Sequence, residues 1–524
     1  MTVIDAARPA APGEAPEEAA DRPRTAARKL RRTVAARRSA TVAFLLPTAV
    51  ALAFLLYGIG DRQLWQDEHA TWWAAMLSFP DLGTLLKGVD VVFAPFYVLM
   101  HLWTSLFGTS ETALRLPSAL AMAAAAGLLG LLGRRLFDLR TGLLAGLVFA
   151  VLPTVTRFGQ EARPYAFAVA FVLLATLLLV RVLDRPSVKG WALYAACLPL
   201  VGWSHLVSLS VLAAHLCAVL SARRTGDRTS AWGFSGSVLV GVSFVLPMAA
   251  RGSGQSGQIS WNNPTLQTFL AFPRDVVGSW QTAVPLLVLG VVGMALAGRP
   301  RVMLAVWALL PPLLTFATAD VLRLFYYRYL LFTLPAWVLL AAVAVCRLTG
   351  PWSARTRRQP FVWLGWVLAA AAATAVLWLS LPGMNTARQA QRDIWWEPDY
   401  RGTARLIERQ QKPGDAVVYG GATSGTIVRR GLAYELRDAP RHPADVLVST
   451  TAQEAGAFAP AEAAPPKKAL RGHDRVWVLT SPASGDPYTG LNPGTVSVLR
   501  SGYEPTATHR LKNVTVTLFE RSHR

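Results

Sequence analysis

The 524-residue sequence has little charge, few cysteines and a shortage of acidic side chains. Only 16% of its residues are charged, whereas soluble domains carry about 25%. The three cysteines, Cys197, Cys217 and Cys346, all lie in apolar runs, which excludes a disulfide framework in the polar C-terminal region. No glycine-rich phosphate-binding fingerprint and no paired-histidine spacing is present. The sequence therefore gives no sign of a nucleotide site or of a histidine-rich metal site.

What the sequence has instead is long apolar runs. Hydrophobic residues make up 53% of the chain and the mean hydropathy is +0.34. Several runs approach or exceed the ~20 apolar residues that cross a bilayer, so we predict a multi-span membrane protein. Lysine and arginine exceed aspartate and glutamate by 52 to 31, for a net charge of +21. Basic cytoplasmic loops account for much of this excess, which argues against a nucleic-acid partner.

Changes in composition divide the chain into three parts. Residues 1–40 are predicted to be a disordered, basic cytoplasmic tail. Residues 41–384 are predicted to be a helical transmembrane module with a large first outer loop, 61–114, and residues 385–524 an extracytoplasmic α/β domain. Basic loops predict that the N-terminus lies inside and the C-terminus outside, and the Ala/Arg-rich composition indicates a bacterium, so we expect a bacterial plasma membrane. The eleven predicted spans are 41–60, 116–132, 141–156, 166–183, 190–204, 206–221, 231–249, 283–297, 302–318, 329–346 and 361–381.

Three amphipathic stretches are too short to span comfortably. Glu68–Phe79 and Pro95–Phe107 lie in the first outer loop, and residues 267–280 (QTFLAFPRDVVGSW) lie in a later one. Each has an apolar face and flanking polar residues. We predict helices that lie in the membrane interface.

The C-terminal domain has shorter apolar runs and more turns. Residues 415–419, 445–449 and 475–480 read as buried strands, and residues 400–411 as a helix before the first of them. Strands that alternate with helices predict a largely parallel sheet. Residues 512–519 alternate and predict a final edge strand. We interpret the domain as a lid or docking module without catalysis of its own.

The candidate chemistry begins directly after the first span, at Asp67, Glu68 and His69. Charged groups at or near bilayer depth are costly and usually functional. The alternative is that Asp67 only caps a short surface helix. Further polar groups are placed at the same outer face by the predicted topology: Asp90, His101, Arg157, Glu161, Arg163, His205, Asp275, Arg323 and Arg328.

Acids and arginines at one membrane face suit the transfer of a group from a lipid phosphate. A carboxylate deprotonates the acceptor hydroxyl, and arginines hold the departing phosphate. Competing interpretations are open for each residue. Arg163 and Arg328 could snorkel from helix ends to headgroups, and Glu161 could form a local salt bridge with Arg157 or Arg163.

Several segments in order resemble one known superfamily. They are the Asp-Glu pair after the first span, an MHLW segment leading into LFGTSETALRLPSAL, then FGQEARPYAF and YYRYLLFTLP. These segments resemble the GT-C membrane glycosyltransferases, in particular the protein O-mannosyltransferase-like group. That group is related to the bacterial lipid A aminoarabinose transferases. The resemblance covers roughly residues 40–380. It implies an inverting transferase that moves a mannose-like sugar from a polyprenyl phosphate to a glycan, lipid or protein hydroxyl at the outer face.

The resemblance also implies roles for individual residues. Asp67 matches the presumed general base, and Glu68 is its neighbour and a candidate for contact with the acceptor or a metal. Glu161 matches an acidic position in the next outer loop. Arg163 and Arg328 match positions expected near the lipid phosphate.

Three more side chains complete the candidate site for substrate or phosphate: Tyr165, Asp90 and His69. Asp90 stands where many relatives carry a His-Pro-Pro-Leu-Tyr type run, which this chain lacks. No cofactor is required, because a sugar phosphodiester already has a good leaving group. A divalent metal is possible, since Asp67, Glu68, His69 and His205 offer oxygen and nitrogen ligands.

Two other function classes compete with a transferase. A flippase or transporter of lipid-linked sugars would be expected to show repeated halves and charged helices near the midplane. No clear repeat is found, and the charges cluster at one face. A structural or regulatory envelope protein would leave the clustered acids and arginines unexplained.

Overall fold

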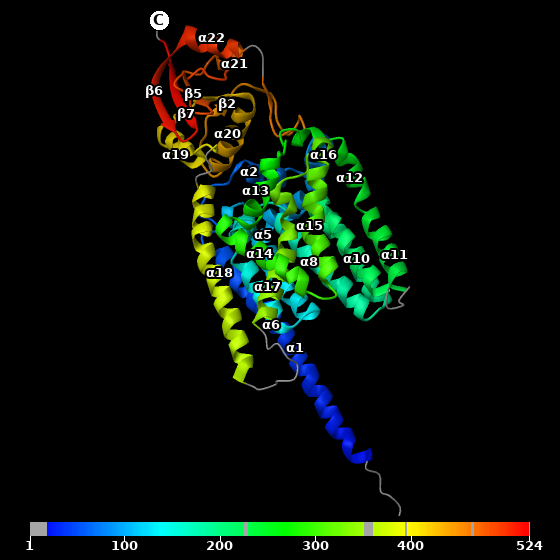
Figure 1. Ribbon diagram of the computed structural model, residues 1–524. Coiled ribbons are helices and arrows are strands. Elements are labelled where there is room, and N and C mark those ends of the chain that lie inside the picture. Colours follow the sequence, from blue (N-terminus) through cyan, green and yellow to red (C-terminus); the bar gives the residue numbers. More distant parts are fainter. Residues whose placement is uncertain (1–17, 224–228, 350–359, 393–395, 463–465, 523–524) are drawn as a thin grey trace, which may run out of the picture.

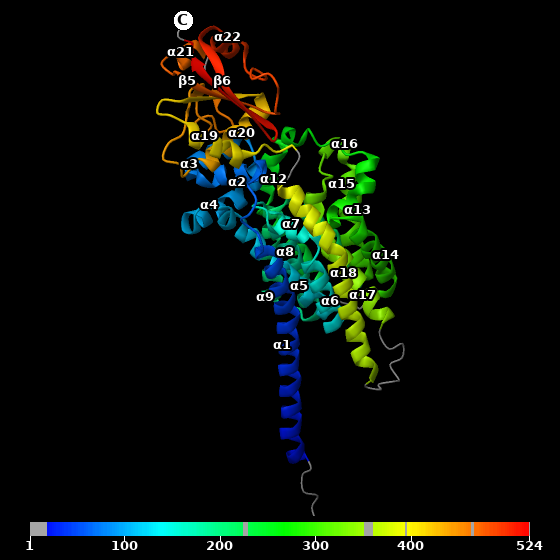
Figure 2. The ribbon, with the colours of Figure 1, turned by 90° about the vertical axis from the view of Figure 1, so that its left-hand side faces the viewer.

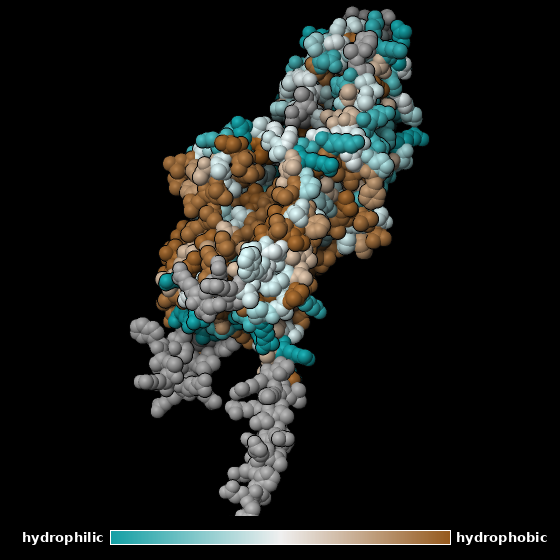
Figure 3. Space-filling model, turned by 90° about the vertical axis from the view of Figure 1, so that its right-hand side faces the viewer, coloured by the Kyte–Doolittle hydropathy of each residue, from teal (hydrophilic) through white to brown (hydrophobic). Residues whose placement is uncertain are grey.

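The computed structural model describes residues 18–223, 229–349, 360–392, 396–462 and 466–522. A tall helical module carries a small α/β domain at one end, and helix α1 projects from the other end (Figure 1). On the face shown in Figure 3, apolar side chains cover much of the helical module, whereas the C-terminal domain is mostly hydrophilic. This distribution is that of a membrane protein with a domain outside the bilayer. We call the end that carries the C-terminal domain the site end.

The helical module consists of helices alone among the described residues. They are α1 (Glu18–Leu56), α2 (Gln66–Met76), α3 (Phe79–Gly88), η1 (Val91–Phe93), α4 (Ala94–Phe107), α5 (Glu111–Leu136), α6 (Leu139–Ala150), α7 (Pro153–Gly159), α8 (Tyr165–Asp184), α9 (Val188–Ser204), η2 (Leu206–Ser210), α10 (Val211–Arg223), α11 (Thr229–Ser243), α12 (Leu246–Ser253), η3 (Ser256–Ile259), α13 (Leu266–Val277), α14 (Trp280–Leu296), α15 (Arg301–Ala317), α16 (Ala319–Leu322), η4 (Tyr327–Thr333), α17 (Leu334–Leu348) and α18 (Pro360–Arg392).

The predicted count of eleven spans is not confirmed. Four helical segments of the described chain are long and apolar enough to cross a membrane, or up to seven if each of three bent helix pairs is one span. Each of the eleven predicted runs does contain a helix. The three predicted interfacial stretches are also helical, as α2 with α3, as α4 and as α13.

The predicted N-terminal tail is described only in part. Residues 1–17 lie outside the described residues, and residues 18–40 are helical as the first part of α1. Alanine, arginine and leucine favour helix, and the apolar run that follows supplies a long helix for them to extend.

Glycines let the central helices approach closely. A side chain on Gly130 of α5 would place its Cβ 2.0 Å from the Ala43 carbonyl oxygen of α1, and Gly133 lies against Gly142 of α6. Small residues at such crossings allow the tight backbone contacts of membrane bundles. The crossing packs α1, α5 and α6 together near the end of α5 that is opposite to the candidate site.

The C-terminal domain contains a mixed five-stranded sheet in the order β2-β1-β5-β7-β6. Strands β2, β1 and β5 are parallel, as predicted, and β7 and β6 add antiparallel strands. The elements are α19 (Tyr400–Gln410), β1 (Ala416–Gly420), α20 (Ala422–Glu435), β2 (Ala444–Asp445), β3 (Val448–Thr450), β4 (Ala461–Glu462), α21 (Pro466–Leu470), β5 (Arg475–Thr480), α22 (Pro493–Gly502), β6 (Tyr503–Leu511) and β7 (Val514–Arg521).

Two strand predictions need correction. The strand predicted at 445–449 divides into β2 and β3, and β3 pairs with β4 in a separate two-stranded sheet. The predicted edge strand, β7, lies between β5 and β6 with its first six residues buried. The true edge, β6, was missed because its sequence is polar and contains Pro505, which weakens a strand pattern.

The C-terminal domain rests directly on the first loop of the membrane module. Figure 2 shows α19 and α20 above α2 and α3. Arg401 forms an ion pair with Glu111 at the start of α5, and the Tyr434 hydroxyl donates a hydrogen bond of 2.9 Å to the carbonyl of Thr109. The domain therefore covers the segment that carries the candidate acids.

Candidate active site

Helix α2 places the two adjacent carboxylates on different sides. Asp67 and Glu68 occupy the second and third positions of the helix, and successive residues of an α-helix are rotated by about 100°. The Asp67 side chain is 23% exposed, whereas that of Glu68 is fully buried. The two neighbours therefore meet entirely different surroundings.

Asp67 lies against the two arginines that the sequence placed at the same face. Its Oδ2 is 3.0 Å from Nη1 of Arg328 and 3.9 Å from Nη2 of Arg163. The arginine side chains are only 11% and 6% exposed. Neither arginine therefore extends to headgroups as the snorkelling alternative requires, and residues about 100 and 260 positions apart do converge.

Aromatic rings enclose the two guanidinium groups. The guanidinium carbon of Arg163 lies 4.2 Å from the centre of the Phe93 ring, and that of Arg328 lies 5.0 Å from Tyr326 and 5.4 Å from Trp65. Burial is the largest single influence and lowers the pKa of Arg163, but Asp67, Tyr165, Tyr97 and Asp90 together raise it above its usual value. Both cations are thus held in fixed positions in a partly dry environment, where electrostatic interactions are strong.

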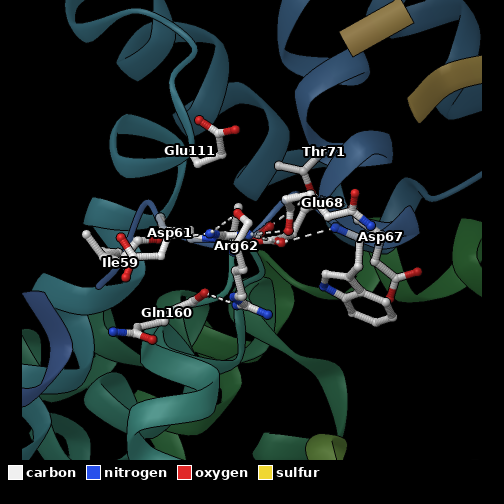
Figure 4. A network of polar contacts seen from close by, with 12 residues as sticks. Ile59, Asp61, Arg62, Asp67, Glu68, Thr71, Glu111 and Gln160 are labelled. Atoms are coloured by element: carbon white, nitrogen blue, oxygen red, sulfur yellow. Dashed lines mark hydrogen bonds and ion pairs between the residues drawn. The ribbon is translucent and has the colours of Figure 1, made fainter. Parts of the chain in front are cut away.

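Glu68 belongs to a closed polar network rather than to an open site (Figure 4). Nε and Nη2 of Arg115 donate hydrogen bonds of 2.7 Å to its two oxygens, and the Ala162 amide donates another of 3.0 Å. Burial opposes ionisation of Glu68, but Arg115 and Arg62 lower its pKa to about 2. Contact of Glu68 with an acceptor or a metal does not fit this geometry, because both oxygens are already occupied.

Arg115 anchors the same network to the loop after α1. Its Nη1 donates to the carbonyls of Ile59 and Arg62, at 2.8 and 3.1 Å. Arg62 in turn donates to the carbonyl of Gln160. The buried network therefore ties together the first loop, α5 and the loop that carries Arg163.

Glu161 lies in that same loop and is also buried. Burial raises its pKa, while Arg157 and Arg62 act against this rise. One of its oxygens, Oε2, has no hydrogen-bond partner. The Glu161 carboxylate interacts electrostatically with Arg157, Arg62 and Arg328. Its position is therefore consistent both with the predicted local pairing with arginine and with a location near the Arg163 and Arg328 pair.

His69 does not face the arginine pair. Its ring is fully buried and packs edge-on against Tyr400 at 4.8 Å and against Tyr434 at 5.6 Å. Burial lowers its pKa to about 3, so the ring is neutral. A phosphate-binding role for His69 does not fit this position, because His69 faces the C-terminal domain.

Asp90 interacts electrostatically with Arg163, and Tyr165 lies beside Arg328. Asp90 has a left-handed backbone, with φ of 58°, and accepts a hydrogen bond of 2.6 Å from the Tyr97 hydroxyl. Burial raises its pKa, against the influence of Arg163. The Tyr165 ring is buried 5.5 Å from the guanidinium carbon of Arg328, and its hydroxyl has no hydrogen-bond partner.

Within the described residues, no three or more histidine, cysteine, aspartate or glutamate side chains are grouped so that they could hold a metal ion. His69 and Glu68 have the other surroundings given above. The possible divalent metal therefore stays a prediction.

The sequence did not point to two important side chains. Arg115 lies within the SETALRLPSA text, and a lone arginine in an apolar run was the available signal. Glu397 lies far away in the chain, yet its carboxylate reaches the start of α2. No local pattern could have indicated a contact across more than three hundred residues.

Comparisons with known proteins match one segment of the chain by sequence and most of it by fold. Residues 94–249 match the family model described as dolichyl-phosphate-mannose-protein mannosyltransferase. No curated protein sequence matches the chain. The predicted resemblance to the mannosyltransferase-like group therefore has a family-model match over residues 94–249.

Solved structures of ArnT from Cupriavidus metallidurans share the overall fold. The structure bound to undecaprenyl phosphate has a TM-score of 0.58 and 15% identity, over 91% of this chain and 98% of that one. The apo structure has a TM-score of 0.59 and 15% identity, over 90% and 97%. The arabinofuranosyltransferase AftD from Mycobacteria matches less closely, with a TM-score of 0.46 and 16% identity, over 93% and 40%.

Proposed function

We propose that this protein is an inverting glycosyltransferase that moves a sugar from a polyprenyl-phosphate donor to an acceptor hydroxyl. The observation that carries the proposal is the contact of Asp67 with Arg163 and Arg328. It joins one partly exposed base with two buried cations. The family-model match and the ArnT-like fold support the same activity.

The three side chains suit the two charges that the reaction moves. Asp67 takes the proton of the acceptor hydroxyl while that oxygen forms a bond to the anomeric carbon. The bond from this carbon to the phosphate oxygen breaks, and the polyprenyl phosphate leaves with the electron pair. Fixed guanidinium groups stabilise such developing charge best when they need no rearrangement.

The ion pairs also suggest how the donor is received. In the free protein, the Asp67 carboxylate neutralises part of the charge on Arg163 and Arg328. A donor phosphate is a stronger, bidentate partner for guanidinium groups. Its binding would leave the Asp67 carboxylate free to accept a proton from the acceptor.

We further propose that transfer occurs on the non-cytoplasmic side of a bacterial plasma membrane and that the sugar is mannose-like. Arginine-rich loops at the end opposite the site support this orientation through the positive-inside rule. The family-model description supports mannose. Glu68, by contrast, is assigned a structural role, because Arg115 and Ala162 occupy its oxygens.

The test is sugar transfer by the purified protein in lipid vesicles. Polyprenyl-phosphate-mannose is supplied with an envelope extract as the source of acceptors, and released polyprenyl phosphate is measured. Asp67→Asn should reduce release by a factor of about 10² to 10⁴, the usual contribution of a general base. Asp320→Asn, an exposed aspartate at the site end, is the matched control and should retain activity. Equal activity of the two variants would refute the role of Asp67.

A further inference from the structure

The segment that enters the C-terminal domain returns to the first turn of α2. The Glu397 side chain is only 4% exposed, and its Oε1 accepts a hydrogen bond of 3.3 Å from the Gln66 amide. Gln66 is the first residue of the helix, so its N–H has no partner within α2. The preceding residue is Trp65, whose side chain has no oxygen to cap the helix.

Further contacts hold this cap in place. The Tyr400 hydroxyl donates to the second oxygen of Glu397, and the Tyr400 ring packs against His69 in α2. Gln63, just before α2, donates to the Pro398 carbonyl at 2.8 Å and accepts from the Tyr400 amide at 3.1 Å. The segment that enters the C-terminal domain therefore contacts residues just before α2 and residues in the first turn of α2.

Burying a carboxylate between two domains costs free energy. Neutral side chains could pack the same interface, whereas a buried charge loses its hydration. Burial raises the pKa of Glu397 to about 7, with Asp67 and Glu68 of α2 adding to the rise and the Tyr400 hydroxyl and Gln66 amide opposing it. Strongly perturbed acids cluster at functional sites.

We propose that Glu397 is a positioning residue that caps, from the C-terminal domain, the helix carrying Asp67. It fixes the first turn of α2, and thereby keeps the Asp67 carboxylate against Arg328 and Arg163. The C-terminal domain completes the site in this way without contacting substrate through this residue. Only the kinetic test of this inference rests on the proposed function, because it requires that the protein transfers sugar.

The kinetic test compares three variants with the wild-type protein in vesicles. Glu397→Ala removes the cap and should lower kcat roughly five- to tenfold, the effect of losing about 1 kcal/mol at a helix N-terminus. Its KM for the donor should change less than kcat. Glu397→Gln retains an oxygen that accepts from Gln66 and should restore most of kcat.

Tyr434→Phe is the matched control. It removes another hydrogen bond between the C-terminal domain and the first loop, to Thr109, but leaves the cap intact. It should behave as wild type. Equal losses in Glu397→Ala and Tyr434→Phe, or no rescue by glutamine, would show a general interface effect and overturn the proposal.

Hydrogen exchange gives a readout that does not depend on activity. Amides at residues 66–69 should exchange faster in Glu397→Ala than in wild type, and at nearly the wild-type rate in Glu397→Gln, with the rest of the membrane module unchanged. Unchanged exchange in Glu397→Ala would overturn the cap. If wild type transfers no sugar at all, the proposed function fails, whereas the exchange result still decides the cap.

Discussion

Arginines at the two ends of the membrane module differ in how deeply they and their partners are buried. At the site end, Arg115, Arg163 and Arg328 are almost fully buried and contact carboxylates or aromatic rings. At the opposite end, arginines line an open hollow of about 910 Å³. The ion pair there, Arg135 with Asp184, is 30% and 57% exposed.

The difference shows which charges the fold holds at a cost. An exposed arginine beside a membrane needs no partner and follows the positive-inside rule. A buried arginine loses several kcal/mol of hydration, which only well-placed acids can offset. The site end is therefore where charge has been fixed in position, and function is expected there.

The largest expected effect is on stability, at Glu68. Glu68→Gln leaves the Arg115 guanidinium buried without a charged partner and should destabilise the protein by about 3–5 kcal/mol. Thermal unfolding in detergent measures the loss. The double variant Glu68→Leu, Arg115→Leu removes both charges and should be less destabilised than Glu68→Gln, and the opposite order would show that the ion pair is not what holds the loop.

The next effect is on catalysis, at Arg328. In the proposed reaction, Arg328→Gln would remove one cation that stabilises the leaving phosphate, and it should lower kcat by a factor of about 10² to 10³. Arg328→Lys keeps the positive charge but loses the planar guanidinium group that binds two oxygens at once. Its activity should therefore lie between those of wild type and Arg328→Gln. Steady-state release of polyprenyl phosphate measures both, and a glutamine variant as active as wild type would place Arg328 outside the site.

A smaller effect concerns pH and the interface above α2. Burial raises the pKa of Glu397 and of Glu435 to about 7, above the usual value of 4.5. Between about pH 4.5 and 7 the folded protein therefore binds more protons than the unfolded protein. Its free energy of unfolding should fall as the pH rises from about 4.5 to 7. In the double variant Glu397→Gln, Glu435→Gln, the unfolding temperature should depend less on pH in this window. If the unfolding temperature of the double variant depends on pH as in wild type, groups other than Glu397 and Glu435 cause the pH dependence.

The smallest effect is expected at the opposite end. Arg181→Gln and Arg185→Gln change exposed side chains of the hollow and should alter stability by less than about 0.5 kcal/mol each. Sugar transfer should stay within a factor of about two. A large loss of transfer would end the distinction between the two sets of arginines.

Much of the site could be predicted from the sequence, because topology and composition constrain it. The first loop had to leave the membrane at the end where Arg163 and Arg328 emerge, so their meeting with Asp67 was predictable. Helix α19 and strands β1 and β5 were also predicted within one or two residues, from ordinary periodicity.

The rest depended on rotation and on distant contacts. Asp67 and Glu68 look equivalent in sequence, yet one step of helix rotation sends Glu68 to Arg115 and leaves Asp67 at the arginine pair. Likewise, His69 meets Tyr400 only because the C-terminal domain folds over α2. The edge strand β6 was missed because it is mostly exposed and its sequence is polar and interrupted by Pro505.

The most direct test of the central claim separates binding from chemistry at Asp67. Affinity for polyprenyl phosphate and turnover of polyprenyl-phosphate-mannose are measured on the same preparations of wild type and Asp67→Asn. Removing the competing carboxylate should leave the affinity equal or higher, while turnover falls by at least about a hundredfold. Undiminished turnover, or a loss of affinity that accounts for the whole loss of turnover, would contradict the assignment of Asp67 as the base between two phosphate-binding arginines.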